Sequence, residues 1–256
     1  MYQALINGVI FTGDDVLSNH AVIINKNIIE RVIPQAKLDS SIDAIFDLNG
    51  QILTAGFIDL QVNGGGGVMF NNTPTVDGLT TLANAHRQYG TTSLLPTLIT
   101  DSFDVMQQAI NAVEQAMKNN VHSIIGIHLE GPFLNTEKKG VHDDEKFCTL
   151  DEQGFQLINS LSGGKTLITI APELTTSNMI KRICNENIIV CAGHSAANFD
   201  QTCEALTYGV TGFTHLYNAM TPLLSRSPGM VGAALNDEKS WFGTVSYTHL
   251  TLPTKA

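Results

Sequence analysis

From about Gln51 onward, short apolar segments alternate with segments of helical periodicity, and this alternation constrains the fold more than any other feature. Most of the apolar segments are continuous runs, which is typical of parallel strands that are covered on both faces. We expect strands in the ranges 52–62, 91–99, 123–131, 165–173, 188–194, 210–219 and, with the weakest pattern, 241–246. Strands that alternate with helices predict an α/β fold with a parallel sheet.

Capping signals indicate where two of the intervening helices begin. Asp101 or Ser102 precedes a run of apolar residues at helical spacing, and Asn119 follows the run as a stop. Asn198 and Gln201 have the spacing of a capping box at the start of a later helix. The first fifty residues differ, because short β-branched stretches are separated there by Asn-Gly and Lys-Asn pairs. That pattern predicts a small antiparallel sheet with tight hairpins.

Polar residues stand at the ends of successive predicted strands, and their placement favours a closed sheet. Asp59 and Gln61 end the first strand, and Glu130, His194 and His215 end later ones. Carboxyl ends of several strands converge at one mouth when a parallel sheet closes, whereas an open sheet gathers them at a single crevice. We therefore predict a (β/α)8 TIM-type barrel. It is incomplete, because six clear strands and one doubtful strand can be counted and the last strand is missing.

Two histidines and a glutamate at three strand ends predict a metal site. Taken singly, Glu130 could form an ion pair with a helix arginine, and His194 or His215 could be a core residue. Together, a carboxylate and two neutral imidazoles suit Zn²⁺ or a similar ion and leave a coordination position for water. Such a water ionises near neutral pH and becomes a nucleophile. His128 could either belong to this metal site or make a structural contact, and its role stays open.

Basic residues near the same mouth could hold an anionic substrate. For Lys138 and Lys139 we favour a solvated turn, whereas His142 in the same loop is a candidate donor to a substrate carbonyl or hydroxyl. The guanidinium of Arg226 matches a phosphate in a bidentate way, although an exposed arginine at a rim is often a bystander.

Composition narrows the class of partner. A formal net charge of −10 argues against nucleic acid, since nothing would neutralise a row of phosphates. No apolar run reaches the ~18 residues that a membrane span needs. The four cysteines form no CxxC pair and are expected to be free thiols, and the N-terminal sequence lacks the features of a signal peptide. We expect a cytoplasmic protein.

Several ordered segments resemble one family. AGFIDLQVNGGGG, PTLIT, HLEGPFLN with KKGVH, APE, AGHSAAN, THLYNAM and SPGMVGAAL are similar to the N-acetylglucosamine-6-phosphate deacetylases of the amidohydrolase superfamily. The resemblance extends from near residue 1 to about Gly243. It implies a small β-sandwich portion over 1–52, a metal-dependent barrel over 53–243, and a tail over 244–256 that lies outside the family pattern.

The resemblance also implies roles for individual residues. The positions that match the family's metal ligands are Glu130, His194 and His215. The positions that match its substrate contacts are Val141, His142, Asn218, Ala219 and Arg226. Many amidohydrolases carry an HxH pair where this chain has Gln61 and Asn63, and amides are poor ligands for Zn²⁺. We therefore expect one divalent metal, with Zn²⁺ as the expected ion.

The implied reaction is the hydrolysis of the acetamide of N-acetylglucosamine 6-phosphate to glucosamine 6-phosphate and acetate. A metal-activated water would attack the acetyl carbonyl, His142 would stabilise the oxyanion, and an aspartate would move the proton. The family's aspartate on an eighth strand is absent from this chain, so we expect a truncated chain without appreciable turnover. Self-association of the full-length protein is expected from the family.

Two other functions stay open from the residues alone. One is another amidohydrolase activity, such as that of a cyclic amidase or a deaminase. The other is a non-catalytic protein that binds a metal or a sugar phosphate.

Overall fold

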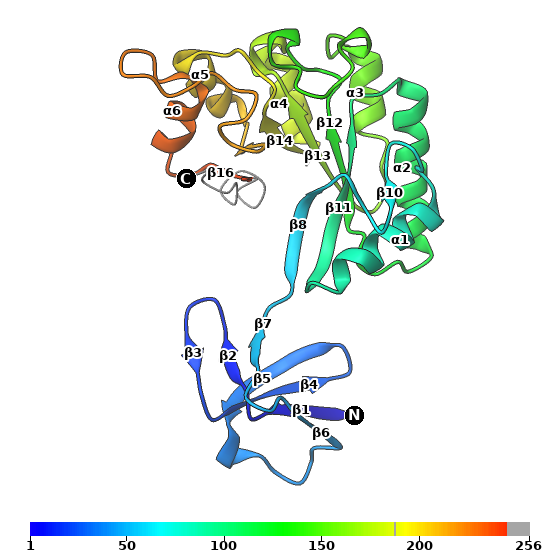
Figure 1. Ribbon diagram of the computed structural model, residues 1–256, viewed down its shortest axis with the longest axis vertical. Helices are drawn as coiled ribbons and strands as arrows, with labels where there is room; N and C mark the ends of the chain where they lie inside the picture. The colour runs from blue at the N-terminus through cyan, green and yellow to red at the C-terminus, as the bar shows by residue number, and fades with distance from the viewer. Residues whose placement is uncertain (187, 245–256) are drawn as a thin grey trace, which may run out of the picture. The chain divides into compact units, whose positions relative to one another are not determined.

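The computed structural model describes residues 1–186 and 188–244, and it divides the chain into two compact units, Met1–Phe57 and Ile58–Ala256 (Figure 1). The first unit contains a four-stranded sheet in the order β5-β4-β1-β6 and a three-stranded sheet in the order β3-β2-β7. Its elements are β1 (Tyr2–Ile6), β2 (Val9–Phe11), β3 (Val16–Leu17), β4 (His20–Asn25), β5 (Ile28–Pro34), the 3₁₀ turn η1 (Gln35–Lys37), β6 (Ala44–Asp47) and β7 (Ile52–Thr54).

The prediction of a small antiparallel sheet with hairpins is wrong in part for this unit. Strands β4 and β5 form an antiparallel hairpin, but β1 pairs with β6 in parallel and β2 pairs with β7 in parallel. The segment that holds Asn7 and Gly8 is not a hairpin turn, because it passes the chain from one sheet to the other. Asn7 has a φ of 56°, and a Cβ on Gly8 would lie 2.5 Å from the Leu48 side chain. The Asn-Gly pair thus marks a sharp bend here and does not identify the partner strand.

The second unit is built on a seven-stranded sheet with the order β16-β15-β14-β13-β12-β11-β8. Its strands are β8 (Phe57–Val62), β11 (Thr91–Ile99), β12 (Gly126–Glu130), β13 (Lys165–Ile170), β14 (Ile189–Ala192), β15 (Gly212–Phe213) and β16 (Trp241–Phe242), with the small hairpin β9 (Gly64–Gly65) and β10 (Val68–Met69). All pairings from β11 to β16 are parallel, as predicted. The doubtful strand is present at Trp241–Phe242, residues 243–244 of its predicted range are not in the strand, and residues 245–246 lie outside the described residues.

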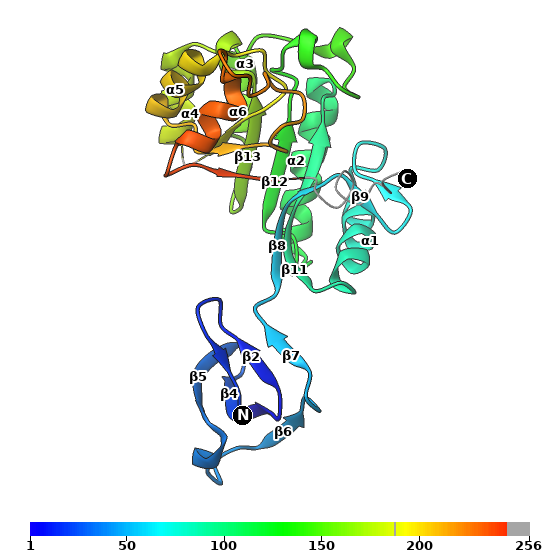
Figure 2. The same ribbon diagram turned by 60° about the vertical axis from the view of Figure 1, so that its left-hand side comes forward.

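Helices lie between consecutive strands and cover the outer face of the sheet (Figure 2). They are α1 (Val76–Arg87), α2 (Phe103–Lys118), α3 (Glu152–Ile158), α4 (Ser177–Asn185), α5 (Phe199–Tyr208) and α6 (Gly229–Asn236), with 3₁₀ turns η2 (Thr136–Lys138), η3 (Asp144–Lys146) and η4 (Pro172–Leu174). The predicted caps are confirmed, because the Ser102 hydroxyl accepts a hydrogen bond from the Val105 amide and Asn198 forms a full capping box with Gln201.

Alternation along each strand decides which side chains reach the interior of the sheet. On β12, Ile127 and Leu129 join the large core between the sheet and the helices, whereas His128 and Glu130 point the other way, since successive strand residues face opposite sides. A second, smaller core on the inner side contains Leu95, Leu167 and Cys191. The sheet therefore has apolar contacts on both faces, as its continuous apolar runs predicted.

The sheet curls so that its two edge strands approach the same cleft. A cavity of about 590 Å³ is lined on one side by residues 58–64 of β8 and its loop and on the other by residues 241–244. A small inner cavity is lined by residues from β8, β12, β13, β14, β15 and β16, which places these strands around one interior. The seven parallel strands are consistent with an incomplete barrel.

Two expectations about the chain as a whole can be set beside the structure. No helix in 1–186 or 188–244 has both the length and the apolar composition that crossing a bilayer requires. The predicted tail 244–256 lies, apart from Thr244, outside the described residues.

Candidate metal centre and active site

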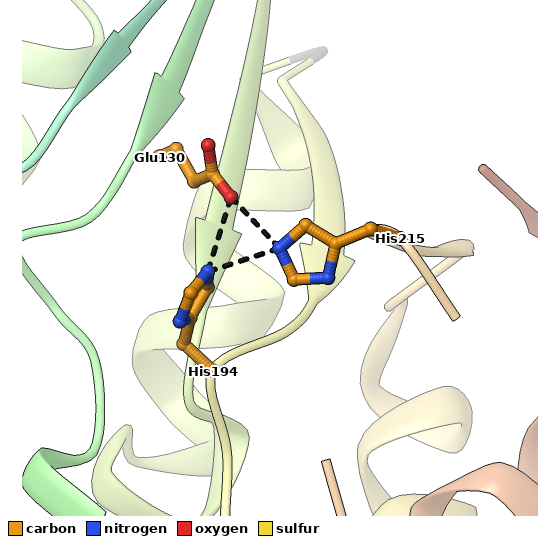
Figure 3. Close-up of side chains that lie close together, drawn as sticks. All are labelled: Glu130, His194 and His215. Carbon is orange, nitrogen blue, oxygen red and sulfur yellow. Dashed lines mark hydrogen bonds and ion pairs between the residues drawn. The ribbon is translucent and has the colours of Figure 1, made fainter. Parts of the chain in front are cut away.

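Three side chains from three strand ends meet at one point, as the sequence predicted. Glu130 ends β12, and His194 and His215 each stand two residues beyond β14 and β15. One carboxylate oxygen, Oε1 of Glu130, lies 3.1 Å from Nε2 of His194 and 3.0 Å from Nε2 of His215, and the two nitrogens are 3.0 Å apart (Figure 3). The three residues are 3%, 4% and 8% exposed. Burial of three such groups together calls for a compensating partner.

Unusual backbone conformations aim the two histidines. His194 has a φ of 47° and His215 a φ of 38°, and Tyr217 and Ala219 in the turn after β15 are also left-handed. Residues other than glycine adopt this conformation at a cost and cluster at functional sites. Gly193 leaves room for the bend, because a Cβ there would lie 2.8 Å from the Thr169 side chain.

The hydrogen bond to Lys138 fixes the tautomer of His194. Nδ1 of His194 lies 2.8 Å from the Lys138 carbonyl oxygen, which can only accept, so Nδ1 carries the proton. In the neutral ring, Nε2 then presents its lone pair toward Glu130 and His215. This is the protonation state that a metal ligand needs, with the other ring nitrogen held by a carbonyl.

The cluster fits a divalent cation. Burial raises the pKa of the Glu130 carboxyl, but hydrogen bonds from the His194 and His215 rings lower it well below the ordinary range, so the group is ionised when positive charge faces it. A carboxylate oxygen and the imidazole lone pair of His194 would repel each other at 3.1 Å unless a positive charge lay between them. A tetrahedral ion with bonds of about 2.0–2.1 Å separates its ligand atoms by about 3.3 Å, which is close to the spacing found. Nδ1 of His215 is buried without a hydrogen-bond partner among the described residues.

Gln61 forms a hydrogen bond with the second carboxylate oxygen of Glu130. Its side-chain amide donates a hydrogen bond to Oε2 at 3.2 Å, so only Oε1 faces the two histidines. Within the described residues, the one group of three or more potential ligands consists of Glu130, His194 and His215. A single-metal centre remains a prediction, which this arrangement supports.

His142 presents a donor beside the cluster. The backbone amide of Thr100 donates to Nδ1 of His142 at 3.3 Å, which assigns the ring proton to Nε2. That Nε2 lies 3.9 Å from Oε1 of Glu130, and the residue is 4% exposed. Burial, followed by repulsion from His194, lowers the pKa of His142 to about 4, so the ring is neutral near pH 7. A neutral Nε2–H next to a cation site is suited to hydrogen bond a carbonyl oxygen.

The other predicted substrate contacts lie on the loops that follow β12 and β15. Val141 is 87% exposed in the loop that carries His142. Asn218 directs its amide to the backbone carbonyl of His215 at 3.3 Å, and the Ala219 carbonyl accepts from the Ser195 amide. Arg226 is exposed on a hairpin after β15, and no described contact joins it to the cluster. The structure therefore brings His142 to the site and leaves the role of Arg226 as a prediction.

His128, which sequence reasoning left open, belongs to the interior of the sheet. Nδ1 donates to the Leu60 carbonyl at 3.0 Å and Nε2 lies 2.7 Å from the Thr169 hydroxyl. Burial lowers the pKa of His128 to about 4. Both ring nitrogens are thus used within the fold, and His128 does not join the three-residue cluster.

Sequence reasoning missed three groups that hold the site. They are Thr100, which orients His142, the carbonyl of Lys138, which orients His194, and the carboxylate of Glu173, which binds the loop after His194. Thr100 follows the predicted strand 91–99 and Glu173 is the last residue of the predicted strand 165–173, and these positions were the available signal.

Two protein-family models match this chain. Residues 52–231 match the amidohydrolase family, and residues 1–53 match the NagA composite domain. The chain therefore belongs to the amidohydrolase family.

Its relatives include sugar-phosphate deacetylases. The chain is 46% identical over 200 residues to an N-acetylgalactosamine-6-phosphate deacetylase of a Shewanella species, with 78% of this chain and 51% of the relative covered. It is 43% identical over 239 residues to an N-acetylglucosamine-6-phosphate deacetylase of Haemophilus influenzae, with 93% and 62% covered. The chain thus spans about half to three fifths of the length of these relatives.

Solved structures of N-acetylglucosamine-6-phosphate deacetylases are similar in fold to this chain. The crystal structure of N-acetylglucosamine-6-phosphate deacetylase from Pasteurella multocida superposes with a TM-score of 0.89 at 36% identity, covering 94% of this chain and 64% of that one. A variant of the deacetylase from Mycobacterium smegmatis in complex with N-acetyl-D-glucosamine-6-phosphate has a TM-score of 0.85 at 27% identity, covering 95% and 62%.

Proposed function

We propose that this protein is a metal-dependent deacetylase that hydrolyses N-acetylglucosamine 6-phosphate to glucosamine 6-phosphate and acetate. The observation that carries the proposal is the convergence of Glu130, His194 and His215 on one point, with the Nε2–H of His142 beside it. Relatives that share most of this chain's length are named as deacetylases of N-acetylhexosamine 6-phosphates. The competing cyclic amidase and deaminase functions have no such support.

Each residue of the site has a distinct task in this reaction. Glu130, His194 and His215 would hold one divalent ion, for which we propose Zn²⁺. The ion supplies a water molecule of lowered pKa for hydrolysis and polarises a carbonyl. His142 donates Nε2–H to the acetyl oxygen and stabilises the negative charge that develops there. The buried position of these side chains keeps competing water from the donor and strengthens its interaction with that charge.

The phosphate and the sugar are assigned to the surrounding loops. We propose that Arg226, which is exposed and has no ion-pair partner among the described residues, binds the phosphate. The Val141 backbone, Asn218 and Ala219 are proposed to contact the sugar. The Shewanella relative, whose name specifies N-acetylgalactosamine 6-phosphate, makes that C4 epimer a second candidate substrate with the same chemistry.

Further properties are proposed on the same basis. The curled sheet supports an eight-stranded (β/α)8 barrel in the whole protein, and the paired sheets of Met1–Phe57 support a small β-sandwich. Domain limits of 1–52, 53–243 and 244–256, a cytoplasmic location, self-association, and the absence of nucleic-acid or membrane partners also remain proposals.

The test measures binding and turnover separately on protein loaded with Zn²⁺. Calorimetric titration should show binding of N-acetylglucosamine 6-phosphate and much weaker binding of the unphosphorylated sugar, with the difference lost in Arg226→Ala. Acetate release should be slow, because no second carboxylate joins the cluster among residues 1–186 and 188–244, and a general acid–base group contributes about 10²–10⁴-fold. Equal binding of both sugars would contradict the sugar-phosphate assignment. Absence of binding by either sugar would contradict the proposed function.

A further inference from the structure

The side chain of Glu173 connects two loops of the site through hydrogen bonds from neutral groups. It lies in η4, directly after β13, and is half-buried. Oε1 accepts from the side-chain amide of Asn135 at 2.9 Å and from the backbone amide of Ala196 at 2.7 Å. Oε2 accepts from the Ser195 hydroxyl at 2.6 Å. In the part of the chain that the structure describes, Glu173 has no ion-pair partner, so these three donors are what holds its charge.

All three donors adjoin His194. Ser195 and Ala196 follow it in the chain, and the backbone amide of Asn135 donates to the His194 carbonyl at 2.9 Å. Asn135 therefore binds His194 through its backbone and Glu173 through its side chain. The Glu173 carboxylate holds the backbone that follows His194 directly, through Ser195 and Ala196. It also holds Asn135, whose backbone amide binds the His194 carbonyl.

His194 needs such a restraint because of its conformation. Its φ of 47° lies in a region that residues with a Cβ rarely adopt, and such a conformation persists only when the surroundings hold it. If the segment relaxed, the ring would rotate away from Oε1 of Glu130 and Nε2 of His215, which it now meets at 3.1 Å and 3.0 Å.

We propose that Glu173 is a positioning residue for the metal centre: its carboxylate locks the segment 194–196 so that Nε2 of His194 points at the shared ion. The inference rests on the metal binding of the proposed function. It assigns to Glu173 an effect on metal affinity that exceeds its effect on the stability of the metal-free fold.

A purely structural role makes a different prediction. If Glu173 only ties η4 to the neighbouring loop, its removal lowers the thermal midpoint of metal-free protein, and the folded molecules still bind metal with normal affinity. Metal affinity at a temperature where every variant is folded therefore separates the two roles.

The experiment compares Glu173→Ala, Glu173→Gln and a matched control, Glu152→Ala. Glu152 also accepts side-chain hydrogen bonds, from Arg182 and Gln156, but it lies on the exposed start of α3 and has no contact with the cluster. Zinc affinity is measured by competition with a chromophoric chelator, and the unfolding midpoint is measured on metal-free protein. Partners that orient metal ligands typically contribute 10–100-fold to metal affinity, so we expect a loss of about that size for Glu173→Ala.

Glutamine should restore most of the lost affinity. Its carbonyl oxygen can accept from Asn135 and Ala196, and its amide can donate to the Ser195 hydroxyl, so the three contacts survive without the charge. Glu152→Ala should bind zinc as the unmodified chain does. The positioning role is supported if zinc affinity is low in Glu173→Ala, close to normal in Glu173→Gln and normal in Glu152→Ala.

Each contrary outcome has its own meaning. Unmodified chain that binds no zinc overturns the metal centre and the positioning role with it. If the unmodified chain binds zinc and folded Glu173→Ala binds zinc equally well, the positioning role alone is overturned. If Glu173→Ala does not fold, Ser195→Ala carries the test, because it removes one of the three donors from a residue that is 0% exposed. Zinc affinity of that variant equal to the unmodified chain would also overturn the inference.

Discussion

Replacement of His215 by alanine should abolish the stabilisation that a divalent ion gives to the unit Ile58–Ala256. The variant retains Glu130 and His194, which are two of the three groups that face the shared point. Structural zinc sites use four protein ligands and catalytic sites three, so a pair of ligands binds the ion far more weakly. Removal of Nδ1 of His215, which is buried and has no hydrogen-bond partner in the described part of the chain, costs the metal-free fold no hydrogen bond from that atom there.

The expected size follows from mass action. At a free zinc concentration of 100 times the dissociation constant, binding to the folded state alone stabilises it by about 2.7 kcal/mol. A domain of 150–250 residues shifts its midpoint by about 2–4 °C per kcal/mol, so the unmodified chain should gain about 5–11 °C. His215→Ala should gain close to nothing at the same zinc concentration.

The assay is thermal unfolding followed by circular dichroism, with zinc and with a chelator, for each variant. The quantity compared is the difference in midpoint between the two conditions, so any cost of the substitution to the metal-free fold cancels. His122→Ala is the matched control, because His122 is an exposed histidine of the same unit. A zinc-dependent gain in His215→Ala equal to that of the control would refute the three-residue site.

Three further outcomes are expected. His142→Ala should lower acetate release by about 10²–10³-fold, the typical effect of losing one oxyanion donor, and leave zinc affinity unchanged; a steady-state assay beside a zinc titration checks both. Gly193→Ala should destabilise the fold by about 1–3 kcal/mol, because its Cβ would lie 2.8 Å from the Thr169 side chain; urea unfolding measures this. Burial raises the pKa of the Cys191 thiol, so native protein should leave it unalkylated even at pH 9 while exposed Cys148 reacts, as mass spectrometry would show.

The sheet and the metal-site residues could be predicted from the sequence because both depend on short-range patterns. A strand in a parallel sheet is a short apolar run, and its carboxyl end lies at the same edge as that of its neighbours. Glu130, His194 and His215 each stand at the end of such a run, so parallel strands of one sheet bring them to the same edge. The helix cap at Ser102 was predictable for a similar reason, since a cap is a contact between residues three positions apart.

Contacts between distant loops could not be predicted in the same way. The pairing of β1 with β6 joins residues about forty positions apart, and the Asn-Gly bend between β1 and β2 gives no information on the partner strand. The proton position on His142 depends on Thr100, which is 42 positions away. No local period encodes such pairs, because they arise only when the strands are already side by side.

The loops after β12, β14 and β15 are connected to one another, and this connection explains how a buried carboxylate and two histidines stay together. The His194 ring is bonded to the loop after β12 through the Lys138 carbonyl, and the next residue is bonded to the turn after β15 through the Ala219 carbonyl. The segment that carries His194 is therefore held by the loops after β12 and β15 as well as by its own strand. Because a ligand displaced by a fraction of an ångström changes its contact with a shared ion, substitutions in any of these three loops should alter metal affinity before they alter the sheet. The helices on the outer face do not contribute to this set of contacts. Substitutions in them should therefore alter the sheet before they alter metal affinity.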